Sequence, residues 1–84
     1  MEFRNTTDER LCYSWGSQCT EIKPNSTSYG IWGSCPSRVT IATPDGREVY
    51  SKVINCDDID LADLFLLINK HDGDFVVLDN VPSN

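Results

Sequence analysis

Four aspartates fall within seven residues of one another, Asp57, Asp58, Asp60 and Asp63. Closely spaced carboxylates can coordinate a hard cation such as Ca²⁺ or Mg²⁺, or they can face the Lys and Arg side chains of a basic partner. The run Asp-Asp-Ile-Asp lacks the alternating aspartates and the glycine of an EF-hand loop. We therefore expect no metal and no cofactor here, and we interpret the cluster as part of a surface that binds a basic protein.

The acidic stretch carries the net charge of the whole chain, which is −6. Residues 57–79 hold seven Asp and one basic residue, Lys70, whereas six acids and six bases cancel in residues 1–56. The seven Lys and Arg form no cluster, so contacts with phosphate are too few to favour direct binding of nucleic acid. The simpler alternative is that the charge only keeps a small protein soluble.

The predicted binding surface combines these acids with one apolar residue. Leu66 is expected on the exposed face of a helix, as an apolar contact amid charge, although single exposed leucines are common. The partner-binding residues that we predict are Asp57, Asp58, Asp60, Asp63, Leu66, Asp72 and Asp74.

Residues for catalysis are scarce. The single histidine, His71, stands beside Asp72, and no Ser/His/Asp or Cys/His spacing accompanies it. The five glycines are scattered rather than gathered in a phosphate-binding loop. We expect His71 to be a surface residue near a helix end, and the protein not to be an enzyme.

The cysteines leave the compartment open. Four cysteines suit two disulfides with three possible pairings, and two N-glycosylation sequons, at residues 5–7 and 25–27, also suit a secreted protein. Zinc knuckles need closer cysteine pairs than this chain offers. No secretion signal or membrane-spanning run is apparent. The favoured interpretation is four reduced, buried thiols in the cytosol: Cys12, Cys19, Cys35 and Cys56.

The N-terminal part predicts one hairpin. Residues 1–10 are polar and are expected to form a flexible arm. Gly16-Ser17 suits a two-residue turn that pairs Leu11 with Ile22 and Tyr13 with Thr20. In that register Cys12 and Cys19 are diagonal neighbours, so a bond between them is expected to need distortion. Residues 24–28 read as a loop and 29–34 as a short aromatic strand. The aromatic residues expected in the core are Tyr13, Trp15, Tyr29 and Trp32.

A second hairpin spans residues 38–54 around Pro44-Asp45-Gly46. A two-residue loop would set Ile41 against Tyr50, and a three-residue loop would set Ile41 against Val49. The second register gathers four aliphatic side chains on one face, so we prefer it.

The C-terminal part predicts a helix and a strand. An N-cap aspartate precedes apolar residues with helical spacing, which indicates a helix at residues 60–71. The continuous apolar run 75–78 indicates a strand buried on both faces, inside the sheet. The expected fold is α+β: one domain of residues 1–84, one antiparallel sheet packed by one helix, and a tail at 79–84.

These features favour a small acidic inhibitor in the cytoplasm of a host cell. It would occlude a basic, nucleic-acid-binding surface on a larger protein, as a nucleic-acid mimic of the kind that phages or toxin-immunity systems encode. The alternative is a secreted, disulfide-stapled binding module that uses its aromatic strands.

Overall fold

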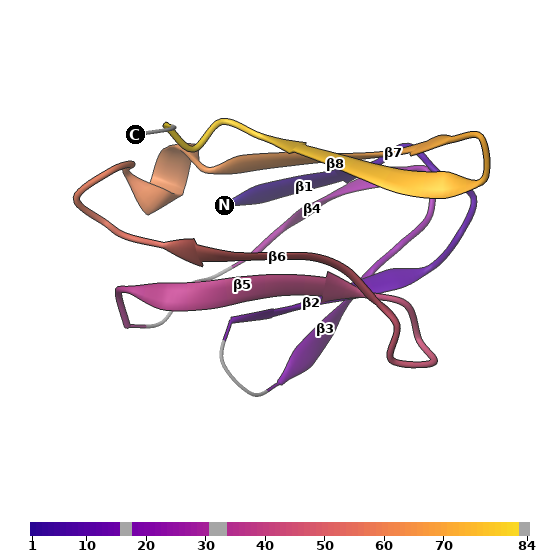
Figure 1. Ribbon diagram of the computed structural model, residues 1–84, viewed down its shortest axis with the longest axis horizontal. Helices are drawn as coiled ribbons and strands as arrows, with labels where there is room; N and C mark the ends of the chain where they lie inside the picture. The colour runs from indigo at the N-terminus through magenta and orange to yellow at the C-terminus, as the bar shows by residue number, and fades with distance from the viewer. Residues whose placement is uncertain (16–17, 31–33, 83–84) are drawn as a thin grey trace.

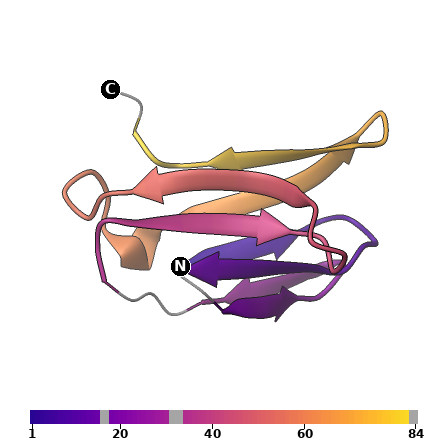
Figure 2. The same cartoon turned by 60° about the horizontal axis from the view of Figure 1, so that its bottom comes forward.

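Two four-stranded sheets stack as the layers of a sandwich (Figures 1 and 2). The computed structural model describes residues 1–15, 18–30 and 34–82. The first sheet has the order β4 (Ser26–Tyr29), β1 (Glu2–Asn5), β7 (Phe65–His71) and β8 (Asp74–Asp79). The second sheet has the order β3 (Cys19–Ile22), β2 (Leu11–Trp15), β5 (Ser37–Ala42) and β6 (Glu48–Ile54). Within the described ranges, the 3₁₀ turn Leu61–Asp63 is the only helical element.

The predicted α+β fold with a helix at 60–71 is therefore wrong. Most of that segment is β7, in which Leu66 and Ile68 are fully buried while the alternating residues Phe65 and Leu67 are only partly covered. This alternation follows the period of two that a strand requires. Asp60 does act as a cap, because its side chain accepts a hydrogen bond from the Ala62 amide, but the turn that it caps ends after three residues.

Residues 2–5 form an inner strand, so the expectation of a flexible arm at 1–10 is wrong for this segment. β1 lies between β4, with which it pairs antiparallel, and β7, with which it pairs parallel. Phe3 is fully buried and stacks on Tyr13 of the second sheet, with ring centroids 4.4 Å apart. The polar composition of residues 1–10 did not indicate this strand, because one buried position of the strand is occupied by Asn5. The side-chain amide of Asn5 is fully hydrogen-bonded.

The strand expected at residues 75–78 is present, but it lies at an edge of its sheet and not in the interior. β8 pairs only with β7, and its residues alternate between partly covered and exposed. Phe75 and Val77 pack against the core, while Val76 and Leu78 face outward. The residues of the continuous apolar run thus alternate between the core-facing side and the exposed side of the sheet.

The first predicted hairpin is confirmed in its register. β2 and β3 pair Leu11 with Ile22 and Tyr13 with Thr20, and the predicted turn residues 16–17 lie outside the described residues. The loop predicted at 24–28 is wrong from residue 26 onward, where β4 begins. Of the predicted strand at 29–34, residues 31–33 also lie outside the described part of the chain.

The preferred register of the second hairpin is wrong over most of its length. Ile41 lies opposite Tyr50, as the rejected alternative proposed, whereas Ala42 lies opposite Glu48. The two pairings are reconciled by a bulge in β6, which shifts the register by one residue. As a result Val53 is exposed, and Tyr50 and Lys52 turn toward the space between the sheets.

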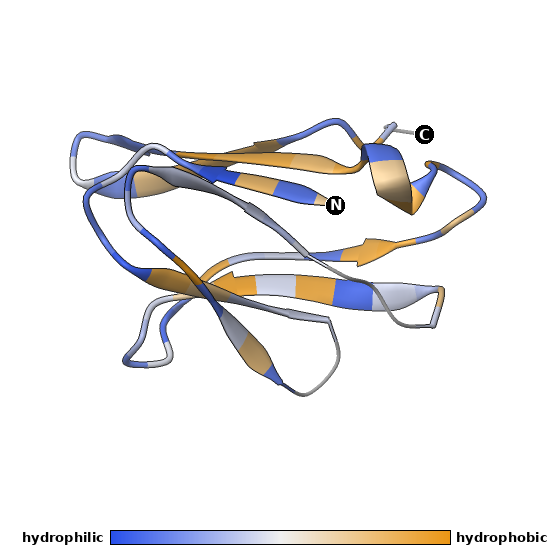
Figure 3. Cartoon of the chain, turned by 180° about the vertical axis from the view of Figure 1, so that it is seen from behind, coloured by the Kyte–Doolittle hydropathy of each residue, from blue (hydrophilic) through white to orange (hydrophobic). Residues whose placement is uncertain are grey.

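One hydrophobic core fills the space between the two sheets. Its buried members come from both layers and from the 3₁₀ turn, and the apolar residues alternate with polar ones along the strands (Figure 3). The largest fully buried side chains are Phe3, Leu11, Ile22, Ile41, Ile54, Leu64, Leu66 and Ile68.

Candidate functional site

A rigidly anchored loop carries the aspartate cluster at one end of the sandwich. We call residues 57–63 the acidic loop. It follows β6 and begins beside Cys56, whose disulfide to Cys35 ties it to the segment that precedes β5. Asn55 receives hydrogen bonds from the Asp57 and Asp58 amides, at 3.0 Å each. At the other end the buried Leu61 anchors the 3₁₀ turn in the core.

The four carboxylates of the acidic loop all belong to exposed residues. Three of them line a shallow depression of about 500 Å³ together with Cys56, Ile59 and Leu61. Among the residues that the structure describes, no salt bridge involves any of the four. Uncompensated, exposed charges on a fixed backbone are available to a cationic partner. The four residues are Asp57, Asp58, Asp60 and Asp63.

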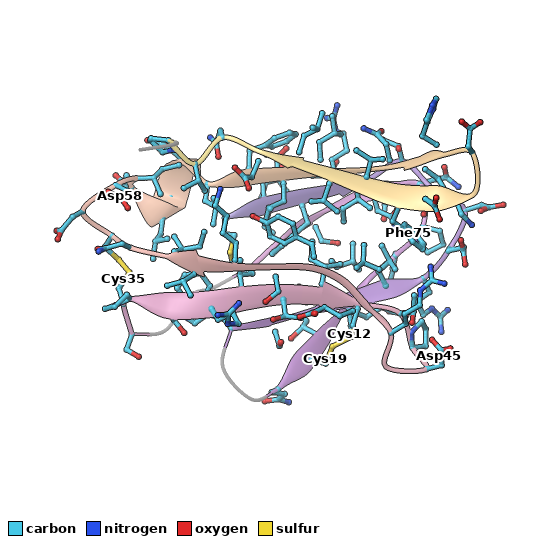
Figure 4. The ribbon with its side chains drawn as sticks, in the orientation of Figure 1. Cys12, Cys19, Cys35, Asp45, Asp58 and Phe75 are labelled. Atoms are coloured by element: carbon cyan, nitrogen blue, oxygen red, sulfur yellow. A yellow bond between two sulfur atoms is a disulfide. The ribbon has the colours of Figure 1, made fainter. Side chains whose placement is uncertain are left out.

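The other predicted binding residues do not join this loop. Leu66 has no exposed surface, because it points into the core from β7, so its predicted role as an exposed contact is wrong. Asp72 and Asp74 flank the turn between β7 and β8, at the opposite end of the strand from the acidic loop. Figure 4 shows Asp58 at one end of the molecule, with Asp45 at the other. The acids therefore form two separate groups.

Both signs of charge occur at the opposite end. Lys70 forms an ion pair with Glu9 and lies 5.1 Å from the centre of the Phe75 ring, which Arg47 also approaches, at 5.9 Å. Glu9, Arg47 and Lys70 line a depression of about 440 Å³ between the β5–β6 and β7–β8 turns. The hydrogen bond from Thr43 is the main cause that lowers the pKa of the exposed Asp45 at its rim. This end presents mixed charge, unlike the acidic loop.

Sequence reasoning missed a polar cluster between the edge strands β6 and β8. Tyr50 donates a 2.5 Å hydrogen bond to Asp79, and Lys52 lies 3.3 Å from the same carboxylate oxygen. Burial opposes ionisation of Asp79, but hydrogen bonds from Tyr50 and the Val81 amide, and the charge of Lys52, lower its pKa overall. Burial, then the hydrogen bond to Asp79, raises the pKa of Tyr50. The correct hairpin register would have revealed this cluster, because it turns both β6 residues inward.

All four cysteines are paired, which contradicts the expectation of free thiols. Cys12 and Cys19 are diagonal neighbours on the outer face of the second sheet, as expected, yet they are bonded with their Cα atoms 5.5 Å apart. That separation lies within the ordinary range for disulfides, so the expected need for distortion is wrong. The Cα atoms of Cys35 and Cys56 are 6.0 Å apart. Both bonds are visible in Figure 4.

The aromatic residues are divided between core and surface. Tyr13 is buried, and Trp15 packs partly against the core, whereas Tyr29 is 77% exposed and so departs from the expected core position. Trp32 lies outside the described residues. The described aromatics thus form no continuous stacking face.

Two structural features are absent from the described ranges. No group of three or more His, Cys, Asp or Glu side chains there is arranged to hold a metal ion. No helix there is both long and apolar enough to cross a bilayer.

Comparisons with known proteins returned nothing. No protein-family model, no curated protein and no solved structure matches this chain. Any functional assignment therefore depends on the physical properties of the sites described above.

Proposed function

We propose that this protein is a disulfide-stapled binding module whose acidic loop occludes a basic surface on a partner protein. The observation that carries the proposal is the anchoring of the loop. Four exposed aspartates are held between a disulfide at Cys56 and the buried Leu64, and none of them has a salt-bridge partner in the described structure. A preorganised charged loop loses little conformational entropy on binding, so more of the electrostatic attraction remains as affinity.

The two disulfides favour an oxidising compartment as the place where the module acts. Thiols are kept reduced in the cytosol of most cells, whereas disulfides persist outside it. This choice replaces the cytoplasmic setting that was predicted from the sequence with four reduced thiols. A basic protein remains the proposed partner, because the exposed carboxylates support such a partner whichever compartment the protein occupies.

The test compares two variants that remove equal charge from opposite ends of the molecule. D57N/D58N/D63N neutralises the acidic loop and leaves the capping residue Asp60 in place, while D45N/D72N/D74N neutralises the two turns at the other end. Binding of a fluorescent oligoarginine peptide is measured by anisotropy over a range of salt concentrations. Electrostatic binding weakens as salt screens the charges.

We expect the loop variant to bind the peptide at least about tenfold more weakly than the native protein does. A tenfold change corresponds to a loss of ~1.4 kcal/mol of binding free energy. The control variant should lose much less affinity, although its net charge is the same. Equal losses in both variants would mean that the peptide responds only to net charge. An unchanged affinity in the loop variant would exclude the acidic loop as the binding site. Thermal unfolding of each variant confirms that the domain remains folded.

A further inference from the structure

The two N-glycosylation sequons of this chain stand in opposite structural settings. Asn5 lies on the inner strand β1 and is 1% exposed, whereas Asn25 lies in the turn between β3 and β4 and is exposed. Attachment of a bulky glycan requires an asparagine that can remain at the surface of the folded protein. The fold therefore distinguishes two sites that the sequence pattern treats as equal.

Asn5 is a structural residue whose amide is fully engaged. Its Nδ2 donates to the carbonyl oxygens of Glu9, at 2.8 Å, and Lys23, at 3.3 Å. Its Oδ1 accepts from the amide and the hydroxyl of Thr7, at 3.0 and 2.7 Å. A sugar on Nδ2 would replace one of its two hydrogens, so it would break one of the two donor bonds and would have to fit beside a residue that is only 1% exposed. Glycosylation of Asn5 is thus incompatible with this fold.

Asn25 has the opposite character. Its backbone amide donates to the Thr7 carbonyl, at 2.9 Å, and its φ of 50° places it in a left-handed turn conformation that asparagine tolerates well. Ser26 closes the same turn through a 2.8 Å hydrogen bond to the Lys23 carbonyl. The backbone is therefore fixed, while within the described part of the chain no hydrogen bond involves the Asn25 side chain.

The rest of the second sequon is also accessible. Thr27 lies on β4 opposite Arg4, so it shares the outward face of the first sheet, away from the core. A shallow depression of about 210 Å³ adjoins Asn25 and is lined in part by Arg4, Thr6 and Thr27. Its polar rim offers donors and acceptors to the first sugar residue, so the surface around Asn25 can accommodate a glycan without displacing apolar groups.

We infer that Asn25 is the N-glycosylation site of this protein and that Asn5 is not modified. The inference rests on the oxidising, secretory setting of the proposed function. The Nδ2 of Asn25 forms a bond to the anomeric carbon of an oligosaccharide carried on a polyisoprenyl diphosphate. The bond from that carbon to the phosphate oxygen breaks, the polyisoprenyl diphosphate leaves, and one amide proton passes to a base of the transferase.

The experiment expresses the full chain behind a cleavable secretion leader in eukaryotic cells. Intact mass is recorded before and after treatment with peptide-N-glycosidase, and tryptic mapping assigns the site, because cleavage after Arg10 separates the two sequons. N25Q and T27A both remove the second sequon. T27S is the matched control, since serine preserves the sequon.

We expect one N-linked glycan, on Asn25, in the native protein and in T27S, and none in N25Q or T27A. A secreted, disulfide-bonded protein with a bare Asn25, or with a glycan on Asn5, would overturn the inference. If secretion is poor, the same variants are translated with endoplasmic-reticulum microsomes, and a bare Asn25 there would overturn the inference equally. Oligoarginine binding by N25Q tests the acidic loop separately, so loss of the glycan and loss of the binding function are distinguishable.

Discussion

The Tyr50 hydroxyl donates a 2.5 Å hydrogen bond to Asp79, and this contact joins the open edges of the two sheets. Tyr50 lies on β6, the edge strand of the second sheet, and Asp79 ends β8, the edge strand of the first. Lys52 approaches the same carboxylate from the next inward position of β6. A polar contact therefore closes one side of the sandwich, beside the hydrophobic core cluster.

This polar contact should make stability depend on acid pH through Asp79. The folded-state pKa of Asp79 lies below its ordinary value of 3.8, so the contribution of its charge is fully present above that value and is lost as pH falls through the folded pKa. We expect the free energy of unfolding to decrease in this acid range, and D79N to show a shallower decrease. Urea unfolding monitored from about pH 7 to about pH 2 measures both slopes. Parallel curves for the two proteins would contradict this role.

Removing the Tyr50 hydroxyl should destabilise the fold, because it leaves a partly buried carboxylate with fewer donors. We expect Y50F to lose about 1–2 kcal/mol of unfolding free energy. Y29F is the matched control, since Tyr29 is 77% exposed and should tolerate the same change with little effect. Chemical unfolding at neutral pH compares the two variants. Equal stability of Y50F and Y29F would show that the polar contact contributes nothing.

The two disulfides should contribute unequally. Cys35 and Cys56 are separated by 21 residues and Cys12 and Cys19 by 7, so the first bond restricts the unfolded chain more. Loop-closure entropy predicts about 3.3 kcal/mol for the longer loop and about 2.4 kcal/mol for the shorter one. Paired Cys→Ala variants, one per disulfide, are compared by urea unfolding. A larger loss on removing the shorter loop would contradict the entropic argument.

The two faces of the first sheet predict unequal effects for Leu66 on β7 and Leu78 on β8. Leu66 is fully buried and Leu78 is 54% exposed on the outer face of the same sheet. L66A should therefore cost about 2–5 kcal/mol, since it opens a cavity in the core. L78A should change stability by less than about 0.5 kcal/mol. Thermal or urea unfolding measures both changes in stability. A small loss of stability in L66A would instead agree with the rejected placement of Leu66 on the exposed face of a helix.

Local pattern was sufficient for the first hairpin. Alternating apolar residues on both sides of Gly16-Ser17 specify which face is buried, and a shift of one residue would have exposed Tyr13 and Ile22. In the second hairpin the turn was placed correctly, but the bulge in β6 is not signalled by any residue type in that strand. The predicted register therefore holds only beside the turn, where Ala42 meets Glu48.

Local pattern could not decide the segment from Leu61 to His71. Leu61, Leu64 and Ile68 fit a helical repeat, while Leu64, Leu66 and Ile68 fit a strand repeat equally well. The strand conformation is favoured by β1, which comes from the far end of the chain and pairs with residues 65–68 of β7. The same error affected the predicted site, because a helix would hold the acids at its two ends closer together than the more extended strand β7 does.

The position of β1 in the first sheet constrains the order in which the protein can fold. The second sheet lies entirely within residues 11–54, so its pairings are available early in synthesis. β1 must instead wait for β7, about sixty residues later, and closing so long a loop is entropically slow. Until residues 65–71 leave the ribosome, the strand that carries Phe3 can pair with β4 but lacks β7, its neighbour on the other side. We therefore expect assembly of the first sheet to follow that of the second.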